Sequence, residues 1–269
     1  MEHELRQRFL QARYSYIKQQ FSNLNPQQQE AVMTTQGPLL LLAGAGSGKT
    51  TVLINRIANL IRFGCGADSN EVPDYIGPEE VAFLEAALDS DDPHVRMRAD
   101  ALCACRPAAP WNIIAITFTN KAANEMKARL ERMLGQEGQD VWAMTFHSAC
   151  CRILRRYIDR LGYDNHFTIY DTTDSERVIK DIIKELDLDD RSFPARMILT
   201  MISRAKDLMQ DPEQFAVQAK TSSDFRMEKI AEVYREYQKR LKAADAVDFD
   251  DIILLTVQLL QSQEDVRLY

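Results

Sequence analysis

Residues 39–51 read Leu-Leu-Leu-Leu-Ala-Gly-Ala-Gly-Ser-Gly-Lys-Thr-Thr, and this stretch decides the fold. The four leucines, residues 39–42, predict a strand that is buried on both faces. Residues 43–50 match the phosphate-binding loop, with Ala43 in place of the usual first glycine. The apolar residues after the loop recur at helical spacing and predict a helix from Gly48 to about Phe63. Because these features occur in register, the sequence predicts a nucleoside triphosphate site rather than a glycine-rich turn without a ligand.

Each residue type in this loop has a physical role in binding phosphate. Small residues let successive backbone N–H groups point into one concavity, and the following helix adds N–H donors and partial positive charge. Lys49 is expected to reach the β- and γ-phosphates, and the Thr50 hydroxyl to ligate Mg²⁺. The residues predicted to bind ATP are those of the loop and the first helical turn: Ala43, Gly44, Ala45, Gly46, Ser47, Gly48, Lys49, Thr50 and Thr51.

Length and composition indicate an ordinary globular chain. The 269 residues predict two units, with 45% hydrophobic and 27% charged residues. No apolar run reaches the roughly 18 residues of a membrane span, and residues 1–6 lack a signal-peptide pattern. Five cysteines without a recognisable disulfide framework suit a reducing compartment. We therefore expect a cytoplasmic protein without a membrane partner.

The net charge of −7 does not exclude a nucleic-acid partner, because the acidic residues are concentrated in one segment. Residues 64–111 hold ten acidic and three basic residues, so the rest of the chain is balanced. Residues 64–110 are predicted to be an irregular surface insertion, with one short helix over 79–88 after Gly77 and Pro78. Its candidate metal ligands do not have the usual zinc spacings, which disfavours a metal site: Cys65, His94, Cys103 and Cys105.

Two helices are predicted before the leucine run. Residues 2–21 carry apolar side chains at helical spacing. Asn25 as N-cap and Pro26 at the first helical position mark the start of the second helix. Its glutamines, residues 27–29, indicate a solvated helix face by composition alone, although a glutamine can also offer a donor and an acceptor to the edge of an adenine.

Residues 113–116 and 141–145 predict two further buried strands, each followed by a helix. Three strand–helix units predict a parallel α/β sheet, in which ligands bind at the carboxyl ends of the strands. We expect the polar clusters 117–121 and 145–148 on the same edge as the phosphate loop. In the first cluster, an exposed Phe118 would suit base stacking with phosphate contacts beside it, whereas the alternative is a core phenylalanine next to a polar cap.

From Cys150 to about Ala246 the sequence predicts only helices. A capping box over 173–176 and Pro194 each open one of them. Another carries arginines on one face, which either meet DNA phosphates or remain solvated: Arg152, Arg155, Arg156 and Arg160. Residues 247–251 precede a last helix over 252–260, which is expected to rejoin the α/β unit.

Together these segments resemble the UvrD/Rep/PcrA family of superfamily 1 DNA helicases, and most closely its PcrA-type members. The motifs that carry the resemblance are residues 24–28 (Leu-Asn-Pro-Gln-Gln), 43–50, 117–123, 145–148 (Thr-Phe-His-Ser) and 248–251 (Asp-Phe-Asp-Asp). The resemblance covers nearly the whole chain except the N-terminal helix and residues 64–110.

The resemblance implies a fold, sites and an activity. The implied fold class is α/β: an incomplete RecA-like P-loop parallel sheet over 1–149 and 247–269, with an all-helical domain over 150–246 inserted in it. Gln28 would contact adenine. Family members move 3′ to 5′ on single strands, including at ss/ds junctions, and use ATP and Mg²⁺ in DNA repair or replication. The implied path for single-stranded DNA includes six residues: Phe118, Thr119, Asn120, Lys121, Thr145 and His147.

The sequence departs from the family where a catalytic site would be completed. No strand ends in the Asp-Glu pair of motif II, and Asp250 and Asp251 precede an apolar run instead of following one. Phosphoryl transfer needs metal ligation, a positioned water and charge stabilisation together. We therefore expect the N-terminal portion of an ATP-dependent 3′–5′ DNA helicase, truncated before motif II, that binds nucleotide weakly and hydrolyses essentially none. The alternatives are the N-terminal part of an AddA/RecB-type helicase–nuclease and a non-hydrolysing module that binds nucleotide or DNA.

Overall fold

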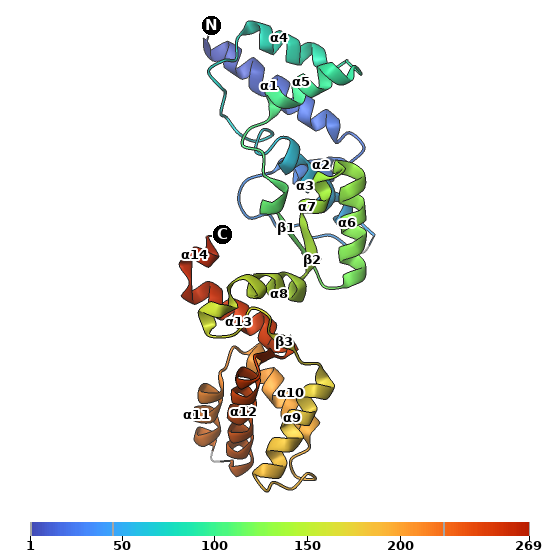
Figure 1. The fold of residues 1–269 in the computed structure, drawn as a ribbon. Coiled ribbons are helices and arrows are strands. Elements are labelled where there is room, and N and C mark those ends of the chain that lie inside the picture. The colour runs from blue at the N-terminus through green and yellow to red at the C-terminus, as the bar shows by residue number, and fades with distance from the viewer. Residues whose placement is uncertain (1, 45, 223, 269) are drawn as a thin grey trace. The chain divides into compact units, whose positions relative to one another are not determined.

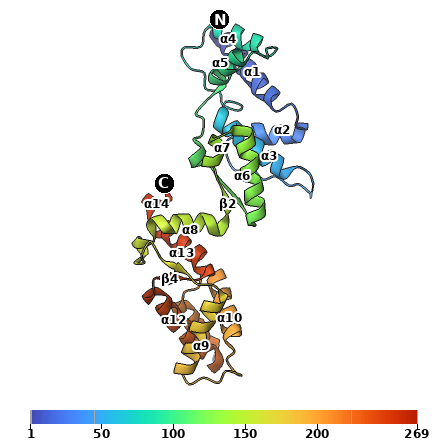
Figure 2. The ribbon, with the colours of Figure 1, turned by 45° about the vertical axis from the view of Figure 1, so that its right-hand side comes forward.

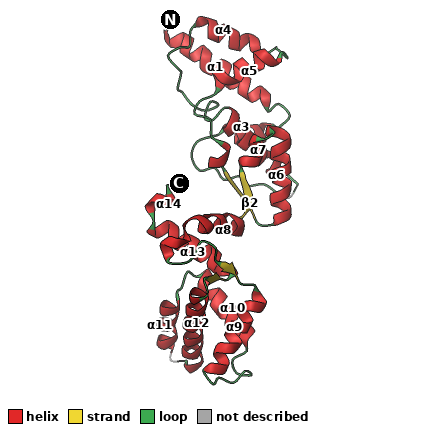
Figure 3. Cartoon of the chain, in the orientation of Figure 1, coloured by secondary structure: helices red, strands yellow, loops and turns green. Residues whose placement is uncertain are grey.

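The computed structural model describes residues 2–44, 46–222 and 224–268 of the chain. Contacts divide it into two compact units, Met1–Met144 and Thr145–Tyr269. Helices dominate both units and the strands are short, as Figure 1 and Figure 3 show. The chain is therefore a mixed, mainly helical protein with small sheets. The finer division expected above, into 1–149, 150–246 and 247–269, remains a prediction.

The first unit is built around a two-stranded sheet and the helices that cover it. Strands β1 and β2 pair with each other, and helix α6 connects them. The helix expected after β1 ends as predicted at Gly135, which has a positive φ. In chain order the elements are α1 (Glu2–Gln20), α2 (Pro26–Met33), α3 (Lys49–Arg62), α4 (Pro78–Ala87), α5 (Pro93–Cys103), η1 (Pro110–Asn112), β1 (Ile114–Thr117), α6 (Asn120–Leu134), α7 (Glu137–Asp140) and β2 (Trp142–Thr145).

Residues 39–42 do not form a strand, so the prediction of a buried strand there is wrong. Leu40 and Leu42 are 80% and 89% exposed, and no strand pairs with this segment within the described residues. A strand needs a neighbour for its backbone groups and cover for its side chains. The same lack of cover leaves Ile114 and Ile116 of β1 exposed, although the sequence predicts a buried strand there. The expected three-stranded sheet is thus two-stranded in the described part of the chain.

The acidic segment 64–110 forms two helices, α4 and α5, that pack against α1, as both Figure 1 and Figure 2 show. Leu84 and Ala99 join Phe9 of α1 in one buried core. The Tyr16 hydroxyl of α1 also donates a hydrogen bond to Asp100 Oδ1 at 2.9 Å. The helix expected near residue 79 is confirmed, but the prediction that the segment is irregular is wrong, because it forms two helices. Its apolar side chains are covered by a helix some 70 residues away in the sequence, which periodicity within the segment does not reveal.

The described residues contain neither a metal-ligand cluster nor a membrane-spanning helix. No group of three or more His, Cys, Asp or Glu side chains in the described ranges is arranged to hold a metal ion. None of the helices found there is both long enough and apolar enough to cross a bilayer.

The second unit is helical, as predicted, apart from the two-residue strands β3 and β4. These strands pair in parallel, with Thr168 opposite Ala246. The N-cap of α9 is Asp171, which shares a capping box with Asp174, so the box lies two residues before the predicted one. In chain order the elements are α8 (Phe146–Tyr157), η2 (Ile158–Leu161), β3 (Thr168–Ile169), α9 (Thr172–Glu185), α10 (Ala195–Asp207), α11 (Pro212–Ser222), α12 (Phe225–Ala243), β4 (Ala246–Val247), α13 (Phe249–Ser262) and α14 (Glu264–Arg267).

A buried lysine connects α10 to the start of α13. Lys206 Nζ lies 2.6 Å from Asp248 Oδ2 and 2.8 Å from Asp251 Oδ1, and all three side chains are buried. Asp248 is the N-cap of α13, and Asp251 completes its capping box. Burial lowers the pKa of Lys206, but the two carboxylates raise it more, so its pKa lies above the ordinary value and the ammonium stays charged. These buried ion pairs therefore fix α10 to the start of α13.

Replacing Lys206 should destabilise the second unit strongly. We expect Lys206→Met to lower the free energy of unfolding by about 3–5 kcal/mol, because two buried carboxylates lose their cation. Denaturant unfolding followed by circular dichroism measures the change. Lys229→Met is the matched control: it removes a partly exposed pair with Glu232 and should cost less than about 1 kcal/mol. Equal losses in the two variants would contradict the assigned role of Lys206.

Candidate nucleotide-binding site

The predicted phosphate loop leads directly into α3. Gly46 and Gly48 adopt φ of 77° and 85°, which favours glycine at both positions. The Ser47 hydroxyl donates to the Gly44 carbonyl at 2.8 Å and closes the turn. The loop residues on either side of this turn are exposed, so the start of α3 is open to solvent. Ala45, which the sequence also assigns to the site, lies outside the described residues.

The Lys49 side chain folds over the backbone of the loop. Its Nζ donates to the carbonyl oxygens of Ala43 at 3.0 Å and of Gly44 at 2.6 Å. A phosphate offers an ionised acceptor and would compete for the same ammonium group. Thr50 is exposed one residue later and Thr51 is half-buried, both in the first turn of α3.

Gln28 connects α2 to the loop. Its Nε2 donates to the Ser47 carbonyl at 3.1 Å, while its Oε1 accepts the Asn25 backbone N–H at 3.1 Å. Asn25 is the N-cap of α2, as predicted, and Gln28 completes a capping box with it. Sequence reasoning missed the contact between Gln28 and the loop. The capping box between Asn25 and Gln28 can be recognised in the sequence, because an asparagine three residues before a glutamine is a capping-box pattern.

Two side chains of α3 hold the end of α2. Asn59 Nδ2 donates to the Val32 carbonyl at 2.9 Å, and the Arg56 guanidinium donates to the carbonyls of Ala31 (2.8 Å) and Thr34. The last carbonyls of a helix have no partner within the helix, so these bonds satisfy groups that would otherwise lack one. They fix α2 against α3 and thereby place Gln28 next to the loop.

The DNA-binding residues predicted in the first unit lie where β1 passes into α6. Phe118 is 89% exposed, which rules out the alternative of a core phenylalanine and suits stacking on a base. Asn120 and Lys121 are exposed in the first turn of α6. Thr119 is the N-cap of α6, and its hydroxyl accepts the Ala122 N–H at 3.2 Å.

Thr145 and His147 belong to the second unit. Thr145 is buried and N-caps α8, where its hydroxyl accepts the Ser148 N–H at 3.3 Å. The His147 ring stacks on Phe249, with ring centroids 4.0 Å apart and an interplanar angle of 25°. Sequence reasoning missed Phe249, although this ring is 58% exposed at the start of α13 and belongs to a motif already singled out. The expectation that residues 117–121 and 145–148 share one edge with the loop stays a prediction.

The sequence model of the UvrD/REP helicase N-terminal domain matches residues 24–72 and 97–269. The chain belongs to this family. It is 44% identical over 253 residues to the ATP-dependent DNA helicase PcrA of Bacillus subtilis (strain 168), which covers 94% of this chain and 28% of that protein. It is 39% identical over 248 residues to PcrA of Staphylococcus aureus (strain Mu50 / ATCC 700699), covering 92% of this chain and 28% of the relative. The chain thus spans little more than a quarter of the length of these relatives.

The UvrD/REP match confirms the family resemblance and shows which residues lie outside it. It leaves out the residues before 24, as expected, but its internal gap of 73–96 is narrower than the predicted insertion 64–110. The two parts outside the match contain α1 and α4, which pack on each other. We refer to α1, α4 and α5 as the accessory helices.

Substituting Gly48 should disturb the site more than substituting Gly44. A Cβ on Gly48 would lie 2.8 Å from Gln28 Nε2 and would require the left-handed backbone, which costs roughly 1–2 kcal/mol for a residue with a side chain. A Cβ on Gly44 would meet nothing within 4 Å. We expect Gly48→Ala to lower the unfolding temperature clearly and Gly44→Ala to leave it nearly unchanged, as measured by differential scanning calorimetry. If Gly44→Ala were the more damaging change, the described loop geometry would be wrong.

Proposed function

We propose that this chain forms the ATP-binding part of an ATP-dependent 3′–5′ DNA helicase or translocase. One observation carries the proposal: the Lys49 ammonium and the Gln28 amide both contact the backbone of a single solvent-open loop at the N-terminus of α3. Membership of the UvrD/REP family supports it, and the relatives named PcrA favour this assignment over a helicase–nuclease.

In this proposal the triphosphate lies across the start of α3. The backbone N–H groups of residues 43–51 surround the phosphates, and the open helix N-terminus adds its partial positive charge. Lys49 exchanges the carbonyls of Ala43 and Gly44 for β- and γ-phosphate oxygens. Gln28 uses its amide to contact adenine while its capping box with Asn25 holds α2 in place.

The exposed Thr50 hydroxyl fits a Mg²⁺ ion that arrives with the nucleotide. Mg²⁺ keeps several waters and takes few protein ligands, so phosphate oxygens would complete its coordination. When bound, the ion neutralises charge on the β- and γ-phosphates. Asp251 does not serve this site, because Lys206 and Gln238 already bind its carboxylate. Since the sequence lacks the Asp-Glu pair of motif II, we expect the isolated chain to hydrolyse essentially no ATP.

We assign single-stranded DNA to the polar ends of β1 and β2. The exposed Phe118 ring would stack on a base, while Asn120 and Lys121 contact phosphates. Thr145 and His147 of the second unit are proposed as further DNA contacts, with Thr145 acting through the start of α8 that it caps. An ss/ds junction is the substrate proposed for the whole protein.

Removing the Lys49 ammonium should weaken nucleotide binding strongly. Fluorescence polarisation of a labelled ATP analogue should show an affinity loss of at least roughly tenfold in Lys49→Ala, since hydrogen bonds to charged groups contribute about 1.5–3 kcal/mol. Lys127→Ala, an exposed lysine on α6, is the control and should bind as the unchanged chain does. Steady-state ATP hydrolysis that Lys49→Ala abolishes would overturn the expectation that the isolated chain is inactive.

Removing the Phe118 ring should weaken binding of single-stranded DNA without changing nucleotide affinity. Labelled oligo-dT should bind Phe118→Ala roughly 5- to 100-fold more weakly, because stacking on one base contributes about 1–3 kcal/mol. Trp111→Ala removes another exposed aromatic ring nearby in the sequence and is the matched control. The DNA assignment fails if the two variants bind equally, or if oligo-dT does not bind the folded chain.

A further inference from the structure

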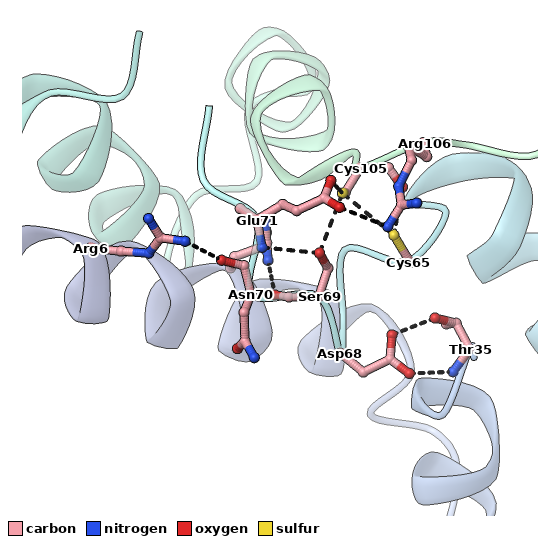
Figure 4. A network of polar contacts seen from close by, with 10 residues as sticks. Arg6, Thr35, Cys65, Asp68, Ser69, Asn70, Glu71, Cys105 and Arg106 are labelled. Carbon is pink, nitrogen blue, oxygen red and sulfur yellow. Dashed lines mark hydrogen bonds and ion pairs between the residues drawn. The ribbon is translucent and has the colours of Figure 1, made fainter. Parts of the chain in front are cut away.

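Cys65 and Cys105 lie side by side near the two ends of the acidic segment, as Figure 4 shows. Gly64 and Cys105 form a parallel β-bridge, and the Cys65 N–H donates to the Cys105 carbonyl at 2.9 Å. The two Sγ atoms are 3.4 Å apart. The bridge and this hydrogen bond bring the backbones of Cys65 and Cys105 next to each other, as a disulfide requires. A covalent bond between the two sulfurs therefore needs only a small side-chain movement.

The surroundings of this pair suit thiol chemistry. Both cysteines are half-buried, so a small oxidant reaches them, whereas Cys103 is fully buried. Cys105 Sγ lies 3.5 Å from Glu71 Oε2, to which its thiol donates a hydrogen bond. Burial raises the pKa of the Cys105 thiol, and its contacts with Cys65 and Glu71 raise it further, so Cys105 stays protonated until the second step of exchange.

Arg13 adds an unusual positive charge to the same region. Its guanidinium is 1% exposed and donates to the backbone carbonyls of Ser69 and Glu71. Its Nε has no hydrogen-bond partner within the described residues. Burial lowers the pKa of Arg13, while the charges of Cys105, Cys103, Cys65 and Glu71 act to raise it. The cation beside the two thiols is Arg106, which pairs with Glu71 at 2.9 Å and lies next to both cysteines in Figure 4.

We propose that Cys65 and Cys105 form a reversible disulfide that fastens the accessory helices to the segment leading into the phosphate loop. The bond would close the chain from residue 65 to residue 105, which includes α4 and α5. This modification site is independent of the nucleotide-binding proposal, because it uses none of the residues assigned to ATP or DNA.

The reaction is thiol–disulfide exchange with a low-molecular-weight disulfide of the glutathione class. The Cys65 thiolate attacks one sulfur of this disulfide, forming a mixed disulfide and releasing one thiolate, which takes up a proton. Cys105 then gives its proton to the released small thiolate or to water and attacks Cys65 Sγ, and the second small thiolate leaves. Two protein thiols are oxidised and one external disulfide is reduced to two thiols, so electrons and protons balance.

The proposed disulfide adjoins the loop 66–71, which contacts two other segments of the first unit. Asp68, three residues after Cys65, accepts the Thr35 N–H at 2.7 Å and the Gln36 N–H at 3.3 Å. Arg6 of α1 donates to the Asn70 carbonyl at 2.8 Å. Figure 4 shows that these contacts and the cysteine pair belong to one network. Closing the disulfide would therefore restrain both α1 and the residues that precede the leucine run.

Mass spectrometry of the full chain tests the proposal. The folded chain is equilibrated with mixtures of reduced and oxidised glutathione, free thiols are blocked, and the protein is digested without reduction. We expect a peptide pair linked through Cys65 and Cys105, which disappears in Cys105→Ser and persists in Cys103→Ser.

The oxidised chain should unfold roughly 5 °C or more above the reduced chain, because the closed segment has fewer unfolded conformations. The amides of Thr35 and Gln36 should also exchange more slowly with deuterium.

Several results would overturn the proposal. One is a folded chain with both thiols free throughout the glutathione series. Another is linkage of Cys65 to Cys103 instead of Cys105, and a third is linkage that forms only in denaturant. An unchanged unfolding temperature in a chain shown to carry the Cys65–Cys105 bond would refute the fastening role.

Discussion

The left-handed turn at Gly48, directly beside the Gln28 amide, is the constraint on which the candidate site depends. It lets the loop reverse into α3, and Gly48 as N-cap has no side chain that could cap the first N–H groups of that helix. The bonds from Asn59 and Arg56 to the end of α2 hold this arrangement, since they set where α2 and its Gln28 lie. Gln28 therefore contacts this loop of small residues from the side, and the ammonium of Lys49 lies over its backbone.

Local signals in the sequence predicted local structure well. Asn25 with Pro26, Gly77 with Pro78, and Gly135 mark helix ends that the structure confirms, because caps depend on residues within one turn. Burial was predicted less well. Leu40 and Ile114 look like core residues, yet both are exposed, because burial depends on which other segments cover them. The ion pairs of Lys206 with Asp248 and Asp251 were likewise invisible, because they join two separate helices.

In the accessory helices, burial was mispredicted in the opposite sense: residues expected at the surface are buried. The acidic composition of residues 64–110 favoured a surface loop, but Leu84 and Ala99 are buried against α1, whose sequence is distant. The proximity of Cys65 to Cys105 follows from the same packing and could not be read from their spacing of 40 residues. The helix that follows the candidate phosphate loop was predictable, since the loop and the helix start are contiguous, whereas the assignment of the loop to nucleotide stays a prediction. The contact of Gln28 with Ser47 and the stacking of His147 on Phe249 were not, because each joins separate segments.

The most direct test of the central claim is a crystal structure of this chain with a non-hydrolysable ATP analogue and Mg²⁺. The account predicts phosphate oxygens within hydrogen-bond distance of the N–H groups at the start of α3. It also predicts that Lys49 Nζ has left the carbonyls of Ala43 and Gly44 for the β- and γ-phosphates. A nucleotide bound elsewhere, or Lys49 still on those carbonyls beside a bound triphosphate, would contradict it.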